Sequence, residues 1–144
     1  MISALKAFGA ESLLDYGCGK ATLGEALKAR SSECSKLTLV NYDPAIEKFA
    51  QSPEPCDLVV CSDVLEHVEP ECLNDVLADL RRLAKKAALL VISTRPSGKF
   101  LPDGRNAHLI IQPAAWWMPK LRKDWTPWQT VANKNELKTL LLPR

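Results

Sequence analysis

The sequence lacks a long hydrophobic run. No apolar segment in its 144 residues approaches the roughly 18 to 20 residues that a membrane-spanning helix needs. The first eight residues also lack the extended apolar core of a secretory signal. Hydrophobic residues make up 47% of the chain and charged residues 25%, the balance of an ordinary globular protein. We therefore expect a cytoplasmic protein without membrane contact, folded as one domain over residues 1–144.

Metal-ligand patterns are also scarce. His67 and His108 are the only histidines, and none of the five cysteines is spaced as C-x2-C. A cysteine-based zinc cluster is therefore not expected, and the sequence predicts no metal site. The odd number and scattered placement of the cysteines favour reduced thiols over a disulfide framework. They stand at Cys18, Cys34, Cys56, Cys61 and Cys72.

The most informative segment that is present is a glycine turn near the N-terminus. Residues 13–19 read Leu-Leu-Asp-Tyr-Gly-Cys-Gly, an apolar strand that ends in an acid and two glycines. Glycine allows positive φ and leaves room for a ligand against the backbone. Helical spacing follows over 22–30, and the strand 37–43 then ends in Asp43. This order is the plan of a nucleoside-binding β-α-β unit, in which the second acid binds ribose hydroxyls.

The turn departs from the dinucleotide fingerprint G-x-G-x-x-G. Thr22 stands where the third glycine belongs, and Asp15 would bring a negative charge close to a pyrophosphate. An acid at that position better suits a ligand that carries an ammonium group and no phosphate. Residues 14–21 resemble the first motif of the class I S-adenosylmethionine-dependent methyltransferases, with Ala21 in place of its last glycine.

A second segment supports the resemblance. A buried strand at 57–60 is followed by Asp63-Val-Leu-Glu-His67, which is similar to the post-strand segment of small-molecule methyltransferases such as those of quinone biosynthesis. The resemblance implies S-adenosylmethionine as cofactor and methyl transfer as the reaction. It implies a cofactor site at Asp15, Tyr16, Gly17, Cys18, Gly19, Asp43, Pro44, Ser62, Asp63 and Val64.

The implied fold is an α/β, Rossmann-like doubly wound sheet, mostly parallel, with a terminal antiparallel hairpin. Only thirteen residues, 44–56, lie between Asp43 and the next strand, too few for the usual third strand and its helices. That strand is expected to be missing, so adenine must be held by the connector 51–55 or by Ser62 and its neighbours. Further helices are expected at 2–8, 69–86 and 113–122, and further strands at 88–94, 128–133 and 136–142.

The acceptor side is predicted from the loop 95–108, which follows the strand ending at Thr94. Ligands of open α/β sheets bind at the carboxyl ends of the strands. We expect this loop to be a lid without regular structure, with cations Arg95, Lys99 and Arg105 for an anionic acceptor. His108 and His67 are the candidate general bases, each against a purely structural role.

Charge and tryptophan leave alternatives open. Residues 1–72 carry a net charge of −6 and residues 73–144 a net charge of +8. Solvated helix faces explain this asymmetry, and so does an anionic small-molecule partner. A nucleotide or single-strand methyltransferase using the four tryptophans for stacking remains open, as does a cofactor-binding subunit without activity. Amino-methylating DNA enzymes carry an Asn/Asp-Pro-Pro-aromatic segment after the strand that corresponds to 57–60, and here Ser62-Asp-Val-Leu stands in that place. A duplex nucleic acid substrate is therefore not expected. A homodimer could cover the unpaired sheet edge.

Overall fold

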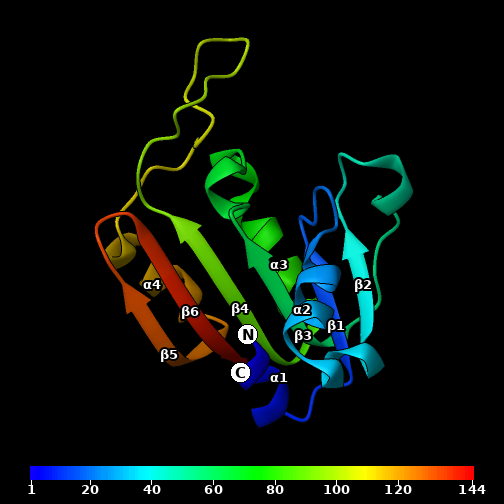
Figure 1. The fold of residues 1–144 in the computed structure, drawn as a ribbon. Coiled ribbons are helices and arrows are strands. Elements are labelled where there is room, and N and C mark those ends of the chain that lie inside the picture. The colour runs from blue at the N-terminus through cyan, green and yellow to red at the C-terminus, as the bar shows by residue number, and fades with distance from the viewer.

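The computed structural model describes residues 1–144, apart from the side chain of Glu33. Six strands form a single sheet in the order β2-β1-β3-β4-β6-β5 (Figure 1). The strands are β1 Ser12–Tyr16, β2 Thr38–Tyr42, β3 Cys56–Ser62, β4 Ala84–Ser93, β5 Trp125–Ala132 and β6 Glu136–Pro143. The α-helices are α1 Ile2–Ala7, α2 Leu23–Arg30, α3 Leu73–Leu83 and α4 Ala114–Leu121. Four 3₁₀ helices complete the chain: η1 Ser32–Lys36, η2 Glu47–Phe49, η3 Leu65–His67 and η4 Pro70–Cys72.

The sheet is parallel across its first four strands. β1 pairs in parallel with β2 and β3, and β3 pairs in parallel with β4. β6 is antiparallel to both β4 and β5, and β5 of this terminal hairpin is the last strand on that side of the sheet. Between β2 and β3 the chain forms only η2. The predicted doubly wound sheet with a missing third strand is therefore confirmed, and β2 is an edge strand.

Helices cover both faces of the sheet. α1, α2 and η1 pack on one face through Leu5, Leu27 and Cys34. α3 and α4 pack on the other face, where the four leucines of α3 recur at positions 73, 77, 80 and 83 and are buried. This spacing places all four on one side of the helix. The parallel strands lie between these two layers, with their carboxyl ends at one edge.

Several element boundaries differ from the sequence predictions. The helix expected over 69–86 begins as η4 and ends at Leu83, because β4 starts at Ala84 and exposes Lys85 and Lys86 before it enters the core. β5 starts at Trp125 instead of residue 128. In the described part of the chain, no helix has the length and apolarity required to cross a bilayer.

The segment 95–108 is also more ordered than predicted. It rises above the carboxyl edge of the sheet as an irregular hairpin (Figure 1). A β-bridge joins Phe100 to Asn106, and the amide of Leu101 donates to the carbonyl of Arg105 at 2.8 Å. As expected, the segment contains no helix or strand, but backbone and side-chain hydrogen bonds hold it in shape. Its role as a lid stays a prediction.

Candidate functional site

The turn after β1 has the backbone conformation that its glycines suggest. Gly17 has φ +77° and Gly19 has φ +49°. The amides of Gly17 and Cys18 both donate to the carbonyl of Tyr42 at the end of β2, at 2.8 and 3.0 Å. Ala21, which stands where the resembling motif has its last glycine, also adopts positive φ, at +56°. The departure from the motif therefore preserves the conformation of the turn.

The two glycines differ in their surroundings. A Cβ atom added at Gly17 would collide with the side chain of Val64, whereas a Cβ at Gly19 would meet nothing within 4 Å. Gly17 thus lets the segment after β3 pack against the turn after β1. Val64 is one of the predicted cofactor-site residues, and the structure brings it directly onto the glycine turn.

Asp43 is fixed at the carboxyl end of β2. One carboxylate oxygen accepts a hydrogen bond from the amide of Gly19 at 3.0 Å, and the other accepts one from the amide of Ala45 at 3.0 Å. Pro44 lies within this small turn. A carboxylate has about four lone-pair positions, so Asp43 can accept two more hydrogen bonds. Its orientation is set by the backbone before any ligand is present.

Asp15 is the buried acid of the site. Its side chain is only 8% exposed, and burial raises its pKa to about 6, with the charge of Asp43 adding to the rise. Burial also raises the pKa of the neighbouring Cys18 thiol, again with a contribution from the two acids. A cationic ligand group next to Asp15 would favour its ionised form. The pair of acids accordingly gives this end of the turn a preference for a cation.

The remaining cofactor candidates lie at the turn with different orientations. The Tyr16 hydroxyl donates to Asp79 on α3 at 3.1 Å, and its ring packs against Tyr42, so the side chain belongs to the core. Only the backbone of Tyr16 is available at the turn. Ser62 donates to the carboxylate of Asp63 at 3.0 Å, and Asp63 has φ +56°.

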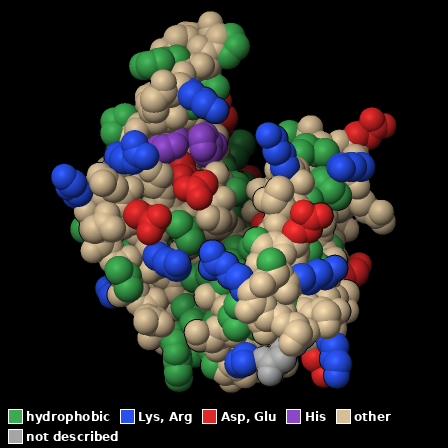
Figure 2. Space-filling model, viewed as in Figure 1, with side chains coloured by type: hydrophobic (Ala, Val, Ile, Leu, Met, Phe, Trp, Pro, Cys, Tyr) green, Lys and Arg blue, Asp and Glu red, His purple; other side chains and the backbone are tan. Residues whose placement is uncertain are grey.

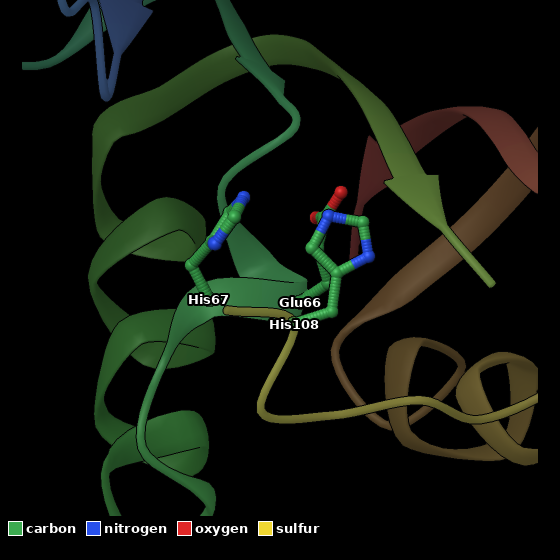
Figure 3. Close-up of side chains that lie close together, drawn as sticks. All are labelled: Glu66, His67 and His108. Atoms are coloured by element: carbon green, nitrogen blue, oxygen red, sulfur yellow. The ribbon is translucent and has the colours of Figure 1, made fainter. Parts of the chain in front are cut away.

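The two histidines meet although they are far apart in the sequence. His67 ends η3, and His108 ends the hairpin 95–108; their ring centroids lie 4.8 Å apart with the planes at 87°. Glu66 lies beside them, fully buried (Figure 3). The amide of Ile110 donates to the Glu66 carbonyl at 3.0 Å, which ties the end of the hairpin to η3. Sequence reasoning selected both histidines separately but missed Glu66 as their neighbour.

The hairpin is braced by Asn106 and Arg105. The side chain of Asn106 accepts hydrogen bonds from the amides of Ser97 and His108 and donates to the carbonyl of Ser97, at 2.9 to 3.0 Å. Arg105 makes a two-pronged ion pair with Glu69 at 2.8 and 2.9 Å and a further contact with Asp103 at 2.8 Å. The expectation that Arg105 is available for an anionic acceptor is therefore wrong, because two carboxylates already occupy its donors.

A polar pocket of about 310 Å³ lies at the carboxyl edge. Figure 2 shows this edge hollowed, with the histidines in purple on one side of the hollow. A larger pocket of about 490 Å³ lies at the opposite edge, between α1 and η1, away from the glycine turn and the histidines. The polar pocket is lined by Asp63, Ser93, Arg95, Asn133, Asn135 and Glu136. Sequence reasoning missed the last three, which the β5–β6 turn supplies.

Comparison with known proteins agrees with this geometry. The family model described as a methyltransferase domain matches residues 2–141. No curated protein matches at a significant level. Among solved structures, a protein from Pyrococcus horikoshii is similar with a TM-score of 0.64 at 14% identity, over 99% of this chain and 89% of that one.

Two further structures are similar to the chain. Magnesium protoporphyrin IX methyltransferase from Synechocystis, with bound S-adenosylhomocysteine, has a TM-score of 0.65 at 17% identity over 99% of this chain and 80% of that one. The 1,6-didemethyltoxoflavin-N1-methyltransferase from Burkholderia thailandensis has the same TM-score and identity, over 99% and 75%. With the family model spanning nearly the whole sequence, the chain belongs to the methyltransferase domain family and is a class I S-adenosylmethionine-dependent methyltransferase.

Proposed function

We propose that the chain transfers a methyl group from S-adenosylmethionine to a small-molecule acceptor held beside the two histidines. The observation that carries this proposal is the β1–α2 turn. Gly17 and Gly19 give the turn its positive φ, and the space beside Gly19 is open to a ligand. Asp43 is oriented by backbone amides, and Asp15 is buried nearby. This combination suits a ligand with vicinal hydroxyls and a cationic group.

Each part of the turn has a proposed role. Asp43 accepts the ribose hydroxyls with its two remaining lone-pair positions. Asp15 faces the ammonium at the methionine end, where the backbone of residues 16–19 approaches the ligand. Pro44 flanks the ribose. Ser62, Asp63 and Val64 bound the adenine side, which the missing third strand leaves without its usual partner.

The acceptor occupies the polar pocket at the ends of β3 and β4. Arg95 lines this pocket. Lys99 belongs to the hairpin 95–108, where its carbonyl accepts a hydrogen bond from the amide of Ala107. No ion pair involving either cation is found among the described residues, in contrast to Arg105. The pocket also carries the acids Asp63 and Glu136. We therefore propose an acceptor whose anionic group lies toward Arg95 and Lys99.

The reaction is an in-line displacement. The acceptor atom forms a bond to the methyl carbon while the bond from that carbon to the sulfonium sulfur breaks, and the electron pair stays on sulfur to give S-adenosylhomocysteine. Positioning supplies much of the acceleration, because the leaving group is good. A hydroxyl or protonated amine must also lose a proton, and His108 or His67 would accept it.

Nucleic acid is a less suitable acceptor than a small molecule. Trp117 and Trp125 are fully buried in the core, and Trp116 packs against Trp117. Trp128 is 66% exposed, but its ring contacts Phe8, away from the pocket residues. The tryptophans therefore do not form a stacking platform at the site.

We further propose that two copies associate along β2. As an edge strand, β2 has no fully buried residue, and its outer backbone groups lack a neighbouring strand. Such an edge invites pairing with another strand. Light scattering at several concentrations tests this: a dimer is expected, and a monomer throughout would contradict it.

Calorimetry with S-adenosylhomocysteine tests the cofactor assignment. Asp43→Ala should weaken binding about tenfold to a hundredfold, which corresponds to about 1.5 to 3 kcal/mol for a charge-assisted contact. Asp75→Ala, which removes an exposed acid on α3, is the matched control and should bind as the wild type does. An Asp43→Ala variant with unchanged affinity, or a wild type that does not bind, would overturn the assignment.

An acceptor screen that follows S-adenosylhomocysteine release then tests the reaction. Small anionic hydroxyl and amine compounds are the expected substrates, with nucleotides and single-stranded oligonucleotides included as competing classes. Cofactor binding without turnover of any compound would favour the inactive partner subunit.

A further inference from the structure

The cluster of Glu66, His67 and His108 has the composition of a metal site. Glu66 and His67 are neighbours in η3, while His108 comes from the far end of the hairpin 95–108. One possible ligand atom from each of the three lies within 4.8 Å of those of the other two. Figure 3 shows the three side chains converging on one region.

Hydrogen bonds select one tautomer of each neutral imidazole. Nδ1 of His67 lies 2.7 Å from the carbonyl oxygen of Ala107, and Nδ1 of His108 lies 2.6 Å from that of Arg95. A carbonyl oxygen only accepts, so each Nδ1 carries a hydrogen and each neutral ring has its lone pair at Nε2. A backbone carbonyl that holds the Nδ1 hydrogen of a histidine is the usual support for a metal ligand.

Glu66 adds an unpaired oxygen to this cluster. One of its carboxylate oxygens accepts a hydrogen bond from the amide of Ser93 at 3.0 Å. The other oxygen, Oε2, is buried and has no hydrogen-bond partner among the described residues. A buried polar atom without a partner is costly, and a bound cation would remove that cost. The side chain itself is fully buried.

We propose that Glu66, His67 and His108 bind one divalent cation of the zinc type. Two imidazole nitrogens and one carboxylate oxygen suit Zn²⁺ or Co²⁺ better than Mg²⁺ or Ca²⁺, which prefer oxygen ligands. Ligands around a tetrahedral zinc stand about 3.3 Å apart at bond lengths near 2.0 to 2.1 Å, so binding draws the three groups closer.

Three protein ligands leave a coordination position open. His67 is exposed and His108 half-buried, so this position is accessible from the acceptor side. An acceptor oxygen bound there would have its pKa lowered by the cation. The role rests on the proposed function and refines it, because the histidines would then activate the acceptor through the metal instead of accepting its proton.

Titration with Co²⁺ alone tests the site. The full chain, without a polyhistidine tag and stripped with a chelator, should bind one Co²⁺ with visible d–d absorption and release it to Zn²⁺. Glu66→Gln keeps the volume and the acceptor for Ser93, and His67→Gln changes an exposed side chain that the core does not need. Because outer partners of metal ligands are worth 10- to 100-fold, loss of a ligand should weaken binding about 100-fold or more.

Cys72→Ser is the matched control, because Cys72 is the exposed thiol among five free cysteines. It should bind Co²⁺ as the wild type does. The proposal is overturned if the wild type binds no Co²⁺, if both ligand variants bind as the wild type, or if Cys72→Ser abolishes binding. Calorimetry with S-adenosylhomocysteine on the stripped protein separates the two proposals: cofactor binding without Co²⁺ binding defeats only the metal site, and failure of cofactor binding defeats the proposed function.

Discussion

The two halves of the carboxyl edge are built by different means. At the ends of β1 and β2 the site consists mainly of backbone, with two glycines and a carboxylate held by amides of residues within 24 positions of it. At the ends of β3 and β4 it consists of side chains, and the two histidines come together across 41 positions. The first half is encoded by one local motif, whereas the second exists only once the hairpin docks on η3.

The largest expected effect separates the two halves. His108→Gln should lower turnover by about 10²-fold or more, the size expected when activation of the acceptor is lost, while S-adenosylhomocysteine affinity stays unchanged. Steady-state rates on the acceptor and calorimetry on the cofactor measure the two quantities. Lys123→Ala, an exposed change after α4, is the control and should alter neither. A parallel loss of cofactor affinity in His108→Gln would mean that the halves are not independent.

The second prediction compares the two glycines of the turn. Gly17→Ala adds a side chain that collides with Val64 and must keep positive φ, so unfolding should become easier by about 2 to 5 kcal/mol. Gly19→Ala keeps positive φ in open space and should cost about 1 to 2 kcal/mol. Urea unfolding of both variants gives the difference. Equal losses would show that Val64 does not pack on the turn.

The third prediction concerns pH and the backbone half alone. Asp15 has a folded pKa of about 6, and a bound cation favours its ionised form. Cofactor affinity should therefore fall by up to about tenfold per pH unit below 6 and level off above it. Calorimetry between about pH 5 and 8 measures this pH dependence of affinity. Asp15→Asn should remove the dependence.

Asp15 also makes the free energy of unfolding depend on pH, in the direction opposite to that of cofactor affinity. Because burial places the folded pKa of Asp15 above its unfolded value, its contribution to stability is present at low pH and is lost as the pH rises through about 6. Asp15→Asn should then melt at a higher temperature than the wild type at pH 8. A lower melting temperature would contradict the assigned burial of its charge.

The smallest expected effects lie on the hairpin. Lys99→Ala should raise the KM for an anionic acceptor about twofold to fivefold, the size expected of an exposed charge contact, without changing cofactor binding. Arg105→Ala should instead loosen the hairpin, because Arg105 is bound to Glu69 and Asp103. Hydrogen exchange of residues 97–107 distinguishes the two: faster exchange is expected only in Arg105→Ala. If Lys99→Ala loosens the hairpin equally, its role is structural.

The half of the carboxyl edge at the ends of β1 and β2 follows from local sequence signals. The glycine spacing and the terminal acid of each strand are local signals, and the short connector 44–56 excluded a third strand by length alone. The boundaries of helices and strands were predicted less accurately where the local signals of two elements overlap. The leucine stripe of α3 runs without a break into Ala84, so the start of β4 depends on pairing with Cys56 of β3.

The half of the carboxyl edge at the ends of β3 and β4 was predicted only in part, because its contacts are tertiary. Nothing in the local sequence indicates that Glu66 would be buried between His108 and β4, or that Asn133 and Asn135 would line the pocket. The hairpin had one local signal, because Asp103 and Arg105 stand two residues apart and can form an ion pair. The ion pair of Arg105 with Glu69 is tertiary. Its geometry required the docked structure.

The contact between Val64 and the Gly17 backbone has a consequence for how this chain can change over time. Val64 stands directly before the η3 segment that carries Glu66 and His67, so the space above Gly17 is shared by both halves of the site. A relative that acquires a side chain at position 17 could keep this fold only with a smaller residue at position 64. Substitutions at positions 17 and 64 should therefore be correlated among related sequences.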